Sequence, residues 1–184
     1  MRYRIMSNTG ERLSLLGFGT MRFPVFDGIL ENIDEAEAIK MLRSAIDRGV
    51  NYVDTAYGYH GGKSEVVVGN ALKDGYRKKV FLADKLPLWL IESEDDLGRI
   101  FGEQLRRLDT DSIDMYLIHN LDAETWHKVS EFNVMGFLEQ KREEGKIKYI
   151  GFSFHDEFDL FQEILKSYPW DFCQIQLNYM DENF

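Results

Sequence analysis

The sequence predicts an α/β fold, a (β/α)8 TIM barrel truncated after about six β-α units, and three observations support it. Short apolar or β-branched runs alternate with longer segments of helical period, which indicates parallel strands joined by crossover helices. Several runs are apolar on both faces, as expected for strands buried between a barrel interior and a helical shell. Polar residues recur near the carboxyl end of strand after strand, which favours a barrel over a doubly wound sheet.

Six segments have the length and composition of strands, and each is followed by turn residues or a helical pattern. They are residues 13–19, 50–54, 80–85, 113–119, 147–153 and 172–177. No Pro-rich, Ser-rich or single-sign charged stretch marks a linker. Residues 1–184 are therefore expected to form one domain, a partial barrel.

The helices between these strands are predicted from their end signals. Asp34 is expected to cap the first helix, and Gly49 stands where a left-handed residue ends it. Ser93 and Asp96 have the spacing of a capping box at the start of another helix. Two further helices are expected at 129–144 and 157–167, ending before Gly145 and Pro169.

The composition restricts the partners and the compartment. The 22 Lys and Arg against 32 Asp and Glu give a formal net charge of -10, which makes a nucleic-acid partner unexpected. Cys173, the only cysteine, excludes an internal disulfide and a metal site built from several thiolates of this chain. It is expected to be buried, and a reducing cytoplasm fits best. No run approaches the ~20 apolar residues of a membrane span, so no membrane partner is expected.

Two glycine runs suggest phosphate-binding motifs and fail the comparison. The Gly-x-Gly run that starts at Gly17 has Arg22 where a dinucleotide fingerprint requires its third glycine. The run Gly62-Lys63-Ser64 ends like a P-loop, but Tyr57 stands where that motif begins with glycine. We interpret it as a helix start capped by Ser64.

Four polar residues near the strand ends have the side chains that carbonyl reduction needs: Asp54, Tyr59, Lys85 and His119. An ammonium beside a phenol stabilises the phenolate and so makes the phenol a better proton donor near neutral pH. A carboxylate would hold the lysine charged, and an imidazole could orient the carbonyl oxygen of the substrate. The set therefore predicts an acid site for carbonyl reduction.

Each of these residues has a structural alternative when it is taken singly. Asp54 and Lys85 can form an ion pair that serves the fold alone. Tyr59 can be a packing residue, and His119 can be a core histidine whose hydrogen bonds are satisfied. His60, beside the expected mouth, is interpreted as a solvated loop residue. The occurrence of all four groups at successive strand ends favours the functional interpretation.

Three segments resemble the aldo-keto reductase family, in the order in which that family has them. They are 51–65, with Asp54 and Tyr59, then 80–85, with Lys85, and 113–119, with His119. The resemblance implies an oxidoreductase that transfers a hydride from a nicotinamide cofactor, NADP or NAD, to an aldehyde or ketone. It implies that Asp54, Tyr59, Lys85 and His119 are catalytic, with Tyr59 as the general acid.

The resemblance also implies which residues contact the cofactor. They are Gly19, Thr20, Met21, Asp54, Ser153 and Gln174. Two positions depart from the family pattern. Asp84 stands before the lysine where the family usually has threonine, which would place a second carboxylate near Asp54. Phe154 follows Ser153 where the family usually has asparagine, so one contact to the carboxamide would be missing.

Segments 60–65, 151–156 and 172–176 resemble a microbial subgroup of this family that carries an iron–sulfur cluster. The cysteines that hold the cluster lie in a C-terminal extension, so the cluster is expected only in a longer parent chain and no metal site is expected within these residues.

With two β-α units absent, the barrel is expected to be open and to self-associate through its strand edges. Two alternatives to carbonyl reduction stay open for this chain. It could be a non-catalytic nucleotide-binding or assembly module, or an inert fragment that another chain completes.

Overall fold

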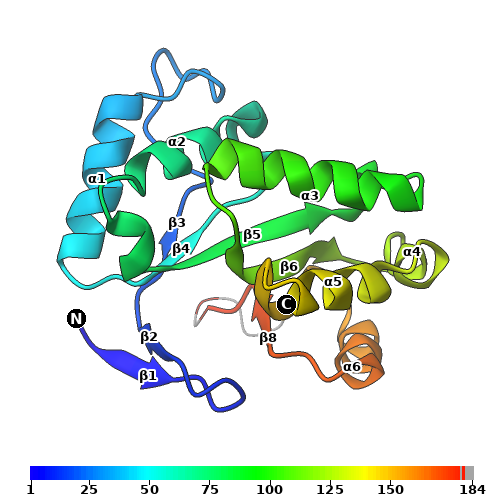
Figure 1. Ribbon diagram of the computed structural model, residues 1–184. Coiled ribbons are helices and arrows are strands. Elements are labelled where there is room, and N and C mark those ends of the chain that lie inside the picture. Colours follow the sequence, from blue (N-terminus) through cyan, green and yellow to red (C-terminus); the bar gives the residue numbers. More distant parts are fainter. Residues whose placement is uncertain (179, 181–184) are drawn as a thin grey trace.

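A computed structural model of the protein describes residues 1–178 and 180 (Figure 1). Six parallel strands form one sheet in chain order, β3 (Phe18–Gly19), β4 (Tyr52–Asp54), β5 (Phe81–Pro87), β6 (Ile113–Leu121), β7 (Ile147–Phe154) and β8 (Phe172–Ile175). The helices are α1 (Glu35–Asp47), α2 (Ser64–Ala71), α3 (Glu94–Leu108), α4 (Trp126–Glu131), α5 (Val134–Glu143) and α6 (Phe158–Ser167). Short 3-10 turns form η1 (Tyr59–Gly62), η2 (Tyr76–Lys79) and η3 (Leu88–Leu90). The alternation of strands and helices that the sequence predicts is confirmed.

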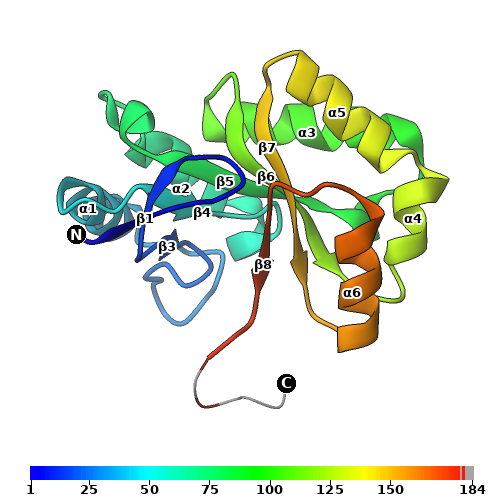
Figure 2. The same cartoon turned by 90° about the horizontal axis from the view of Figure 1, so that it is seen from below.

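The sheet curls into a half-barrel with the helices on its outer face (Figures 1 and 2). Each strand pairs in parallel with the next along the chain, and β3 and β8 are the two edges among the described residues. Helices α1, α2 and α3 follow one another over the first strands, while α5 packs on β7. The carboxyl ends of all six strands therefore share one rim.

Two apolar layers stabilise this arrangement. The larger layer lies between the sheet and the helices, and it includes fully buried Leu82, Tyr116 and Phe152. The smaller layer lies on the inner face around Ala83, Met115 and Leu117. The strands are buried on both faces, which explains why their sequences are nearly continuously apolar.

A hairpin of β1 (Tyr3–Ile5) and β2 (Arg12–Ser14) packs against the inner layer through Met6 and Leu13. The single strand expected at 13–19 is therefore wrong. Ser14 donates its backbone N–H to Asn51 Oδ1 at 2.7 Å and its hydroxyl to Leu16 O at 2.7 Å. These side-chain bonds replace the strand ladder, so the chain turns between β2 and β3.

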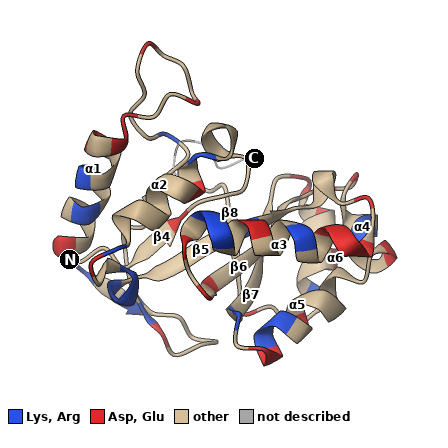
Figure 3. Cartoon of the chain, turned by 45° about the horizontal axis from the view of Figure 1, so that its top comes forward, with Lys and Arg blue, Asp and Glu red and all other residues tan. Residues whose placement is uncertain are grey.

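Most of the helix signals are confirmed. Asp34 accepts the Glu37 N–H at 3.1 Å, and Ser93 with Asp96 forms the capping box of α3. Gly49 has a φ of 97°, a conformation that glycine adopts readily because it has no Cβ. Figure 3 shows that acidic and basic residues alternate along α3. Within the described residues, no helix is long and apolar enough to cross a membrane.

Three expectations about single segments are wrong. The helix expected at 129–144 is two helices. Asn133 interrupts the helix with a φ of 48°, a left-handed conformation that asparagine tolerates. Ser64 makes no cap bond to the helix; its hydroxyl bonds to the hydroxyls of two threonines described below. Cys173 is exposed rather than buried, and it lies on β8, which is an edge strand of the described sheet.

Candidate active site

The four predicted catalytic residues meet at the carboxyl rim of the half-barrel. Asp54 is the last residue of β4, and Lys85 and His119 lie towards the ends of β5 and β6. Tyr59 begins η1, in the loop that follows β4. Parallel strands end at one rim, so residues that are far apart in sequence come together there.

Lys85 is the centre of this cluster. Its ammonium donates to Asp54 Oδ1 at 2.7 Å, to Thr55 O at 2.7 Å and to the Tyr59 hydroxyl at 3.2 Å. A lysine has three N–H donors, and all three are used here. Lys85 is 1% exposed, so the ammonium is held by these contacts rather than by water. Asp54 Oδ2 is buried and has no hydrogen-bond partner among the described residues.

His119 lies against two aromatic rings beside the lysine. Its ring centroid is 6.0 Å from that of Tyr59, edge to face, and 5.0 Å from that of Trp89. Burial, followed by the nearby Lys85 charge and then His155, lowers the pKa of His119 to about 3. The imidazole is therefore neutral near pH 7 and carries one N–H. Its Nδ1 is buried, and no residue in the described part of the chain forms a hydrogen bond with it.

The cluster opens into a small cavity of about 90 Å³ at the rim. The lining residues come from the loop after β4 and from the ends of β5 to β8: Tyr59, Lys85, His119, Ser153, His155, Gln174, Ile175 and Gln176. This cavity holds three of the four predicted catalytic side chains and two of the predicted cofactor contacts. Its polar groups converge on one small volume, as in many ligand sites.

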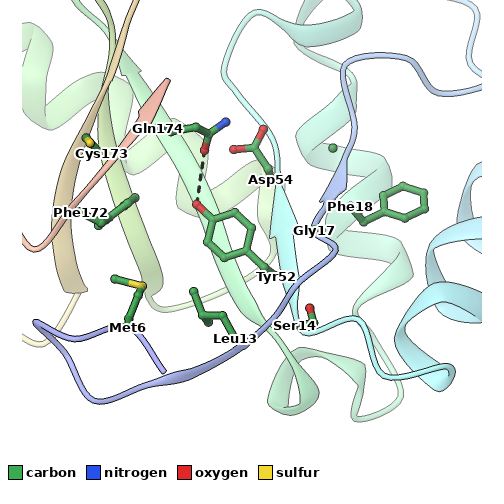
Figure 4. Close-up of a pocket in the computed structure, with 11 residues that line it drawn as sticks. Met6, Leu13, Ser14, Gly17, Phe18, Tyr52, Asp54, Phe172, Cys173 and Gln174 are labelled. Carbon is green, nitrogen blue, oxygen red and sulfur yellow. Dashed lines mark hydrogen bonds between the residues drawn. The ribbon is translucent and has the colours of Figure 1, made fainter. Parts of the chain in front are cut away.

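A second cavity, of about 490 Å³, lies inside the half-barrel between β3, β4 and β8. Figure 4 shows Gln174 reaching across it towards Tyr52, whose hydroxyl lies 3.5 Å from Gln174 Oε1. Met6, Leu13 and Phe172 form an apolar wall. Although this cavity is larger, Tyr59, Lys85 and His119 line the smaller one at the rim, which is therefore the candidate site.

The predicted cofactor residues near β3 differ in how accessible they are. Gly19 and Met21 are exposed near the rim, and Met21 is 55% exposed. Thr20 is fully buried, and its hydroxyl bonds to that of Ser64 at 2.7 Å, so its side chain is occupied inside the protein. Ser64 also bonds to the Thr55 hydroxyl at 3.0 Å, which ties β3 and β4 to the start of α2.

Ser153 and Gln174 lie side by side on paired strands at the rim. The Ser153 hydroxyl accepts the Asn120 N–H at 2.7 Å and keeps its own hydrogen to donate. Asn120 has a φ of 54° beside a register shift in the β6–β7 pairing. Sequence reasoning missed Asn120 and the Thr55 carbonyl, because a backbone group has no side-chain signature.

Two expectations near the site are corrected. His60 is not a solvated loop residue: it is 6% exposed, its Nε2 accepts the Phe23 N–H at 3.1 Å, and its Nδ1 donates to Leu30 O at 2.6 Å. It anchors the loop between β3 and α1. Asp84 does not join the Lys85 cluster through its side chain, because neighbouring residues of a strand point to opposite faces. It is fully buried on the outer face, beside α2 and α3.

A curled parallel sheet with polar groups gathered at its carboxyl rim is the arrangement of a TIM barrel, whose functional sites lie at that face. The model of the Aldo/keto reductase family matches residues 15–184. The chain belongs to this family. It is 33% identical over 156 residues to "Probable aldo-keto reductase 1" of Glycine max, an alignment that covers 80% of this chain and 43% of that protein. The chain spans about half the length of the curated relatives it matches.

Two solved structures show the same fold. The thermostable aldo-keto reductase Tm1743, solved with the inhibitor epalrestat, matches with a TM-score of 0.78 and 31% identity, covering 97% of this chain and 63% of that one. An aldo-keto reductase from Klebsiella pneumoniae, solved with NADPH, matches with a TM-score of 0.74 and 27% identity, covering 97% and 59%. The half-barrel of six strands therefore agrees with the corresponding part of known family members.

Proposed function

We propose that the rim site reduces an aldehyde or ketone with a nicotinamide cofactor, and that Tyr59 is the general acid. One observation carries the proposal: the Lys85 ammonium contacts both Asp54 Oδ1, at 2.7 Å, and the Tyr59 hydroxyl, at 3.2 Å. Because Lys85 donates to the phenol oxygen, the phenol hydrogen is left to bond to a substrate oxygen. Negative charge that develops on the phenol as its proton leaves is stabilised by the ammonium.

His119 would bind the same substrate oxygen. A neutral imidazole donates one N–H and repels no cation, so it can share the carbonyl oxygen with Tyr59 beside the charged Lys85. Trp89, 44% exposed at the rim, covers one face of the imidazole and limits the access of water. These contacts would polarise the carbonyl before the hydride arrives.

The rim residues fit a nicotinamide carboxamide. Ser153 keeps a hydroxyl hydrogen, and Gln174 accepts from Tyr52 through Oε1, which leaves its amide nitrogen to donate. Both line the small cavity beside Tyr59. The cofactor, when bound, supplies the hydride, and this chain supplies position and charge. NADP or NAD is proposed, and the Klebsiella pneumoniae relative solved with NADPH supports the phosphorylated form.

Replacing Tyr59 by phenylalanine is expected to slow NADPH oxidation with simple aldehydes by at least ~100-fold, because the ring stays and the proton donor is lost. Steady-state absorbance measures the rate. Tyr76→Phe is the matched control: Tyr76 bonds to Asp47 at 2.8 Å on η2, away from the rim, and its variant should keep the wild-type rate. Equal rates for Tyr59→Phe and wild type would overturn the assignment of the acid.

A second function is favoured by one departure in the site. Phe154, where the family usually has asparagine, packs against Phe161 with centroids 5.3 Å apart and offers no polar contact to a carboxamide. A nucleotide-binding or assembly module without turnover would follow from such a loss. Titration with NADPH, followed by fluorescence, separates the two functions. Binding without oxidation supports the module, and neither binding nor oxidation supports an inert fragment.

We further propose that residues 1–184 form one domain, corresponding to six β-α units of an eight-stranded barrel. Self-association through the edges β3 and β8 stays a prediction, based on exposed Ile175. Light scattering should show a mass that rises with protein concentration, and the rise should be smaller for Ile175→Lys. A monomer mass that is independent of concentration would contradict self-association.

A reducing compartment such as the cytoplasm is proposed from the free, exposed Cys173. The iron–sulfur subgroup also stays a prediction, for a longer parent chain.

A further inference from the structure

Behind Lys85, on the outer face of the sheet, two carboxyl groups are buried together. Asp84 on β5 and Glu65 on α2 are each 0% exposed, and they are within hydrogen-bonding reach of one another. One oxygen of each, Asp84 Oδ2 and Glu65 Oε1, is buried without a partner among the donors of the described residues. Two ionised carboxylates cannot share such a place at low cost, because both charges would lack water.

The charged and titratable groups around the pair supply one positive charge. Arg107 on α3 donates to Glu65 Oε2 at 2.7 Å and also pairs with Glu103. Tyr57 donates to Glu103 at 2.9 Å. Tyr116 on β6 donates its hydroxyl to Gln104. The Lys85 ammonium is on the opposite face of the strand, bound to Asp54. Within the described residues, no group of three His, Cys, Asp or Glu side chains is placed to hold a metal ion.

Asp84 also holds the backbone of the strand at Lys85. Strand β4 pairs with β5 only as far as Ala83, so Lys85 lies beyond that ladder. The Lys85 N–H donates to Asp84 Oδ1 at 2.8 Å, and the Lys85 carbonyl accepts the Gln104 amide at 2.9 Å. Side chains of the outer face thus bind both backbone polar groups of the residue whose ammonium lies at the rim.

We propose that Asp84 and Glu65 share one proton, held on Asp84 Oδ2 and donated to Glu65 Oε1, and that Asp84 is a positioning residue for Lys85. The proton belongs on Asp84 because Glu65 has the arginine and Asp84 has only a backbone N–H. Burial, followed by the Glu65 charge, raises the pKa of Asp84 well above its usual value, which agrees with this assignment. The positioning role rests on the proposed function; the shared proton does not.

Infrared spectroscopy of the 184-residue chain tests the shared proton directly. Near pH 7 the wild type should show the carbonyl stretch of a protonated carboxylic acid, and D84N should lack it. Asparagine keeps the shape, the acceptor for the Lys85 N–H and a donor towards Glu65. A wild-type spectrum with only carboxylate bands, or an acid band that persists in D84N, would overturn the proposal.

Thermal melting gives a second, independent readout. An acid that is protonated in the fold and ionised when unfolded lowers stability as pH rises from about 4 towards its folded pKa. D84N removes this loss, so its Tm should equal or exceed that of the wild type at pH 7, by a margin that grows with pH. E65Q should lower Tm by at least ~6 °C, because Arg107 loses its buried partner. D84N melting well below wild type near pH 7 would contradict the proposal. The control D74N, on an exposed aspartate, should change little.

The positioning role is tested by comparing D84A with D84N in NADPH oxidation. D84A removes the acceptor of the Lys85 N–H and should lower kcat by about 10–100-fold without a matching change in KM for the cofactor. D84N should restore kcat. Equal kcat values for D84A and wild type would refute the positioning role. If the wild type itself does not turn over, the proposed function fails, while the infrared and melting measurements still decide the shared proton.

Discussion

Replacing Lys85 by methionine is expected to lower the free energy of unfolding by about 3–5 kcal/mol and to abolish carbonyl reduction. Methionine has a similar length but no charge, so the Asp54 carboxylate is left buried beside an apolar group. The side chains of Lys85 and Asp54 are 2% and 12% exposed, and water cannot replace the lost ammonium fully. Chemical denaturation of wild type and K85M measures the difference.

The double variant D54N/K85M distinguishes the stability lost by leaving the Asp54 charge unpaired from the activity lost with the Lys85 ammonium. Because asparagine carries no charge, most of the lost stability should return, while activity stays lost since the phenol has no ammonium beside it. K40M is the matched control: Lys40 pairs with Glu37 at 3.0 Å on the surface, with 74% of its side chain exposed, and should cost less than ~1 kcal/mol. A K85M variant as stable as K40M, or a double variant no more stable than K85M, would contradict this account.

The strand and helix order could be predicted because each signal is local. Alternating apolar runs and the cap residues Asp34 and Ser93 need no knowledge of distant contacts, and the structure confirms them. The hairpin β1–β2 was missed because its first strand is only three residues long and mostly exposed. Pairing at Ser14 depends on Asn51, which is far away in the sequence.

The site could be predicted as a set of residue types at strand ends, and the structure brings Asp54, Tyr59 and Lys85 into direct contact. The groups that hold the Lys85 side chain and backbone in place could not be predicted. Thr55 contributes a backbone carbonyl, and Gln104 acts through the backbone of Lys85 from a helix 19 residues away. Asp84 is next to Lys85 in the sequence, but the two-residue alternation of a strand places its side chain on the face opposite to Lys85 and Asp54.

Lowering the pH is expected to destabilise the protein through His119, and His119→Phe should remove this sensitivity. An unfolded histidine binds a proton below about pH 6.5, whereas burial and the Lys85 charge lower the pKa of native His119 to about 3. Between these values the unfolded chain binds more protons than the native protein, so the free energy of unfolding falls as pH falls. The loss attributable to His119 is about 2 kcal/mol at pH 5 and approaches ~4–5 kcal/mol near pH 3.

The difference between wild type and variant isolates this effect, because Asp84 contributes with the opposite sign in both proteins. Denaturation curves at several pH values between 4 and 7 should show H119F gaining on the wild type by about 1.4 kcal/mol per pH unit below pH 6.5. H127Q, at a site where 62% of the histidine side chain is exposed, should follow the wild-type profile. Parallel profiles for H119F and wild type would mean that His119 takes up its proton in the fold as readily as in the unfolded chain, which would contradict the lowered pKa of the native imidazole.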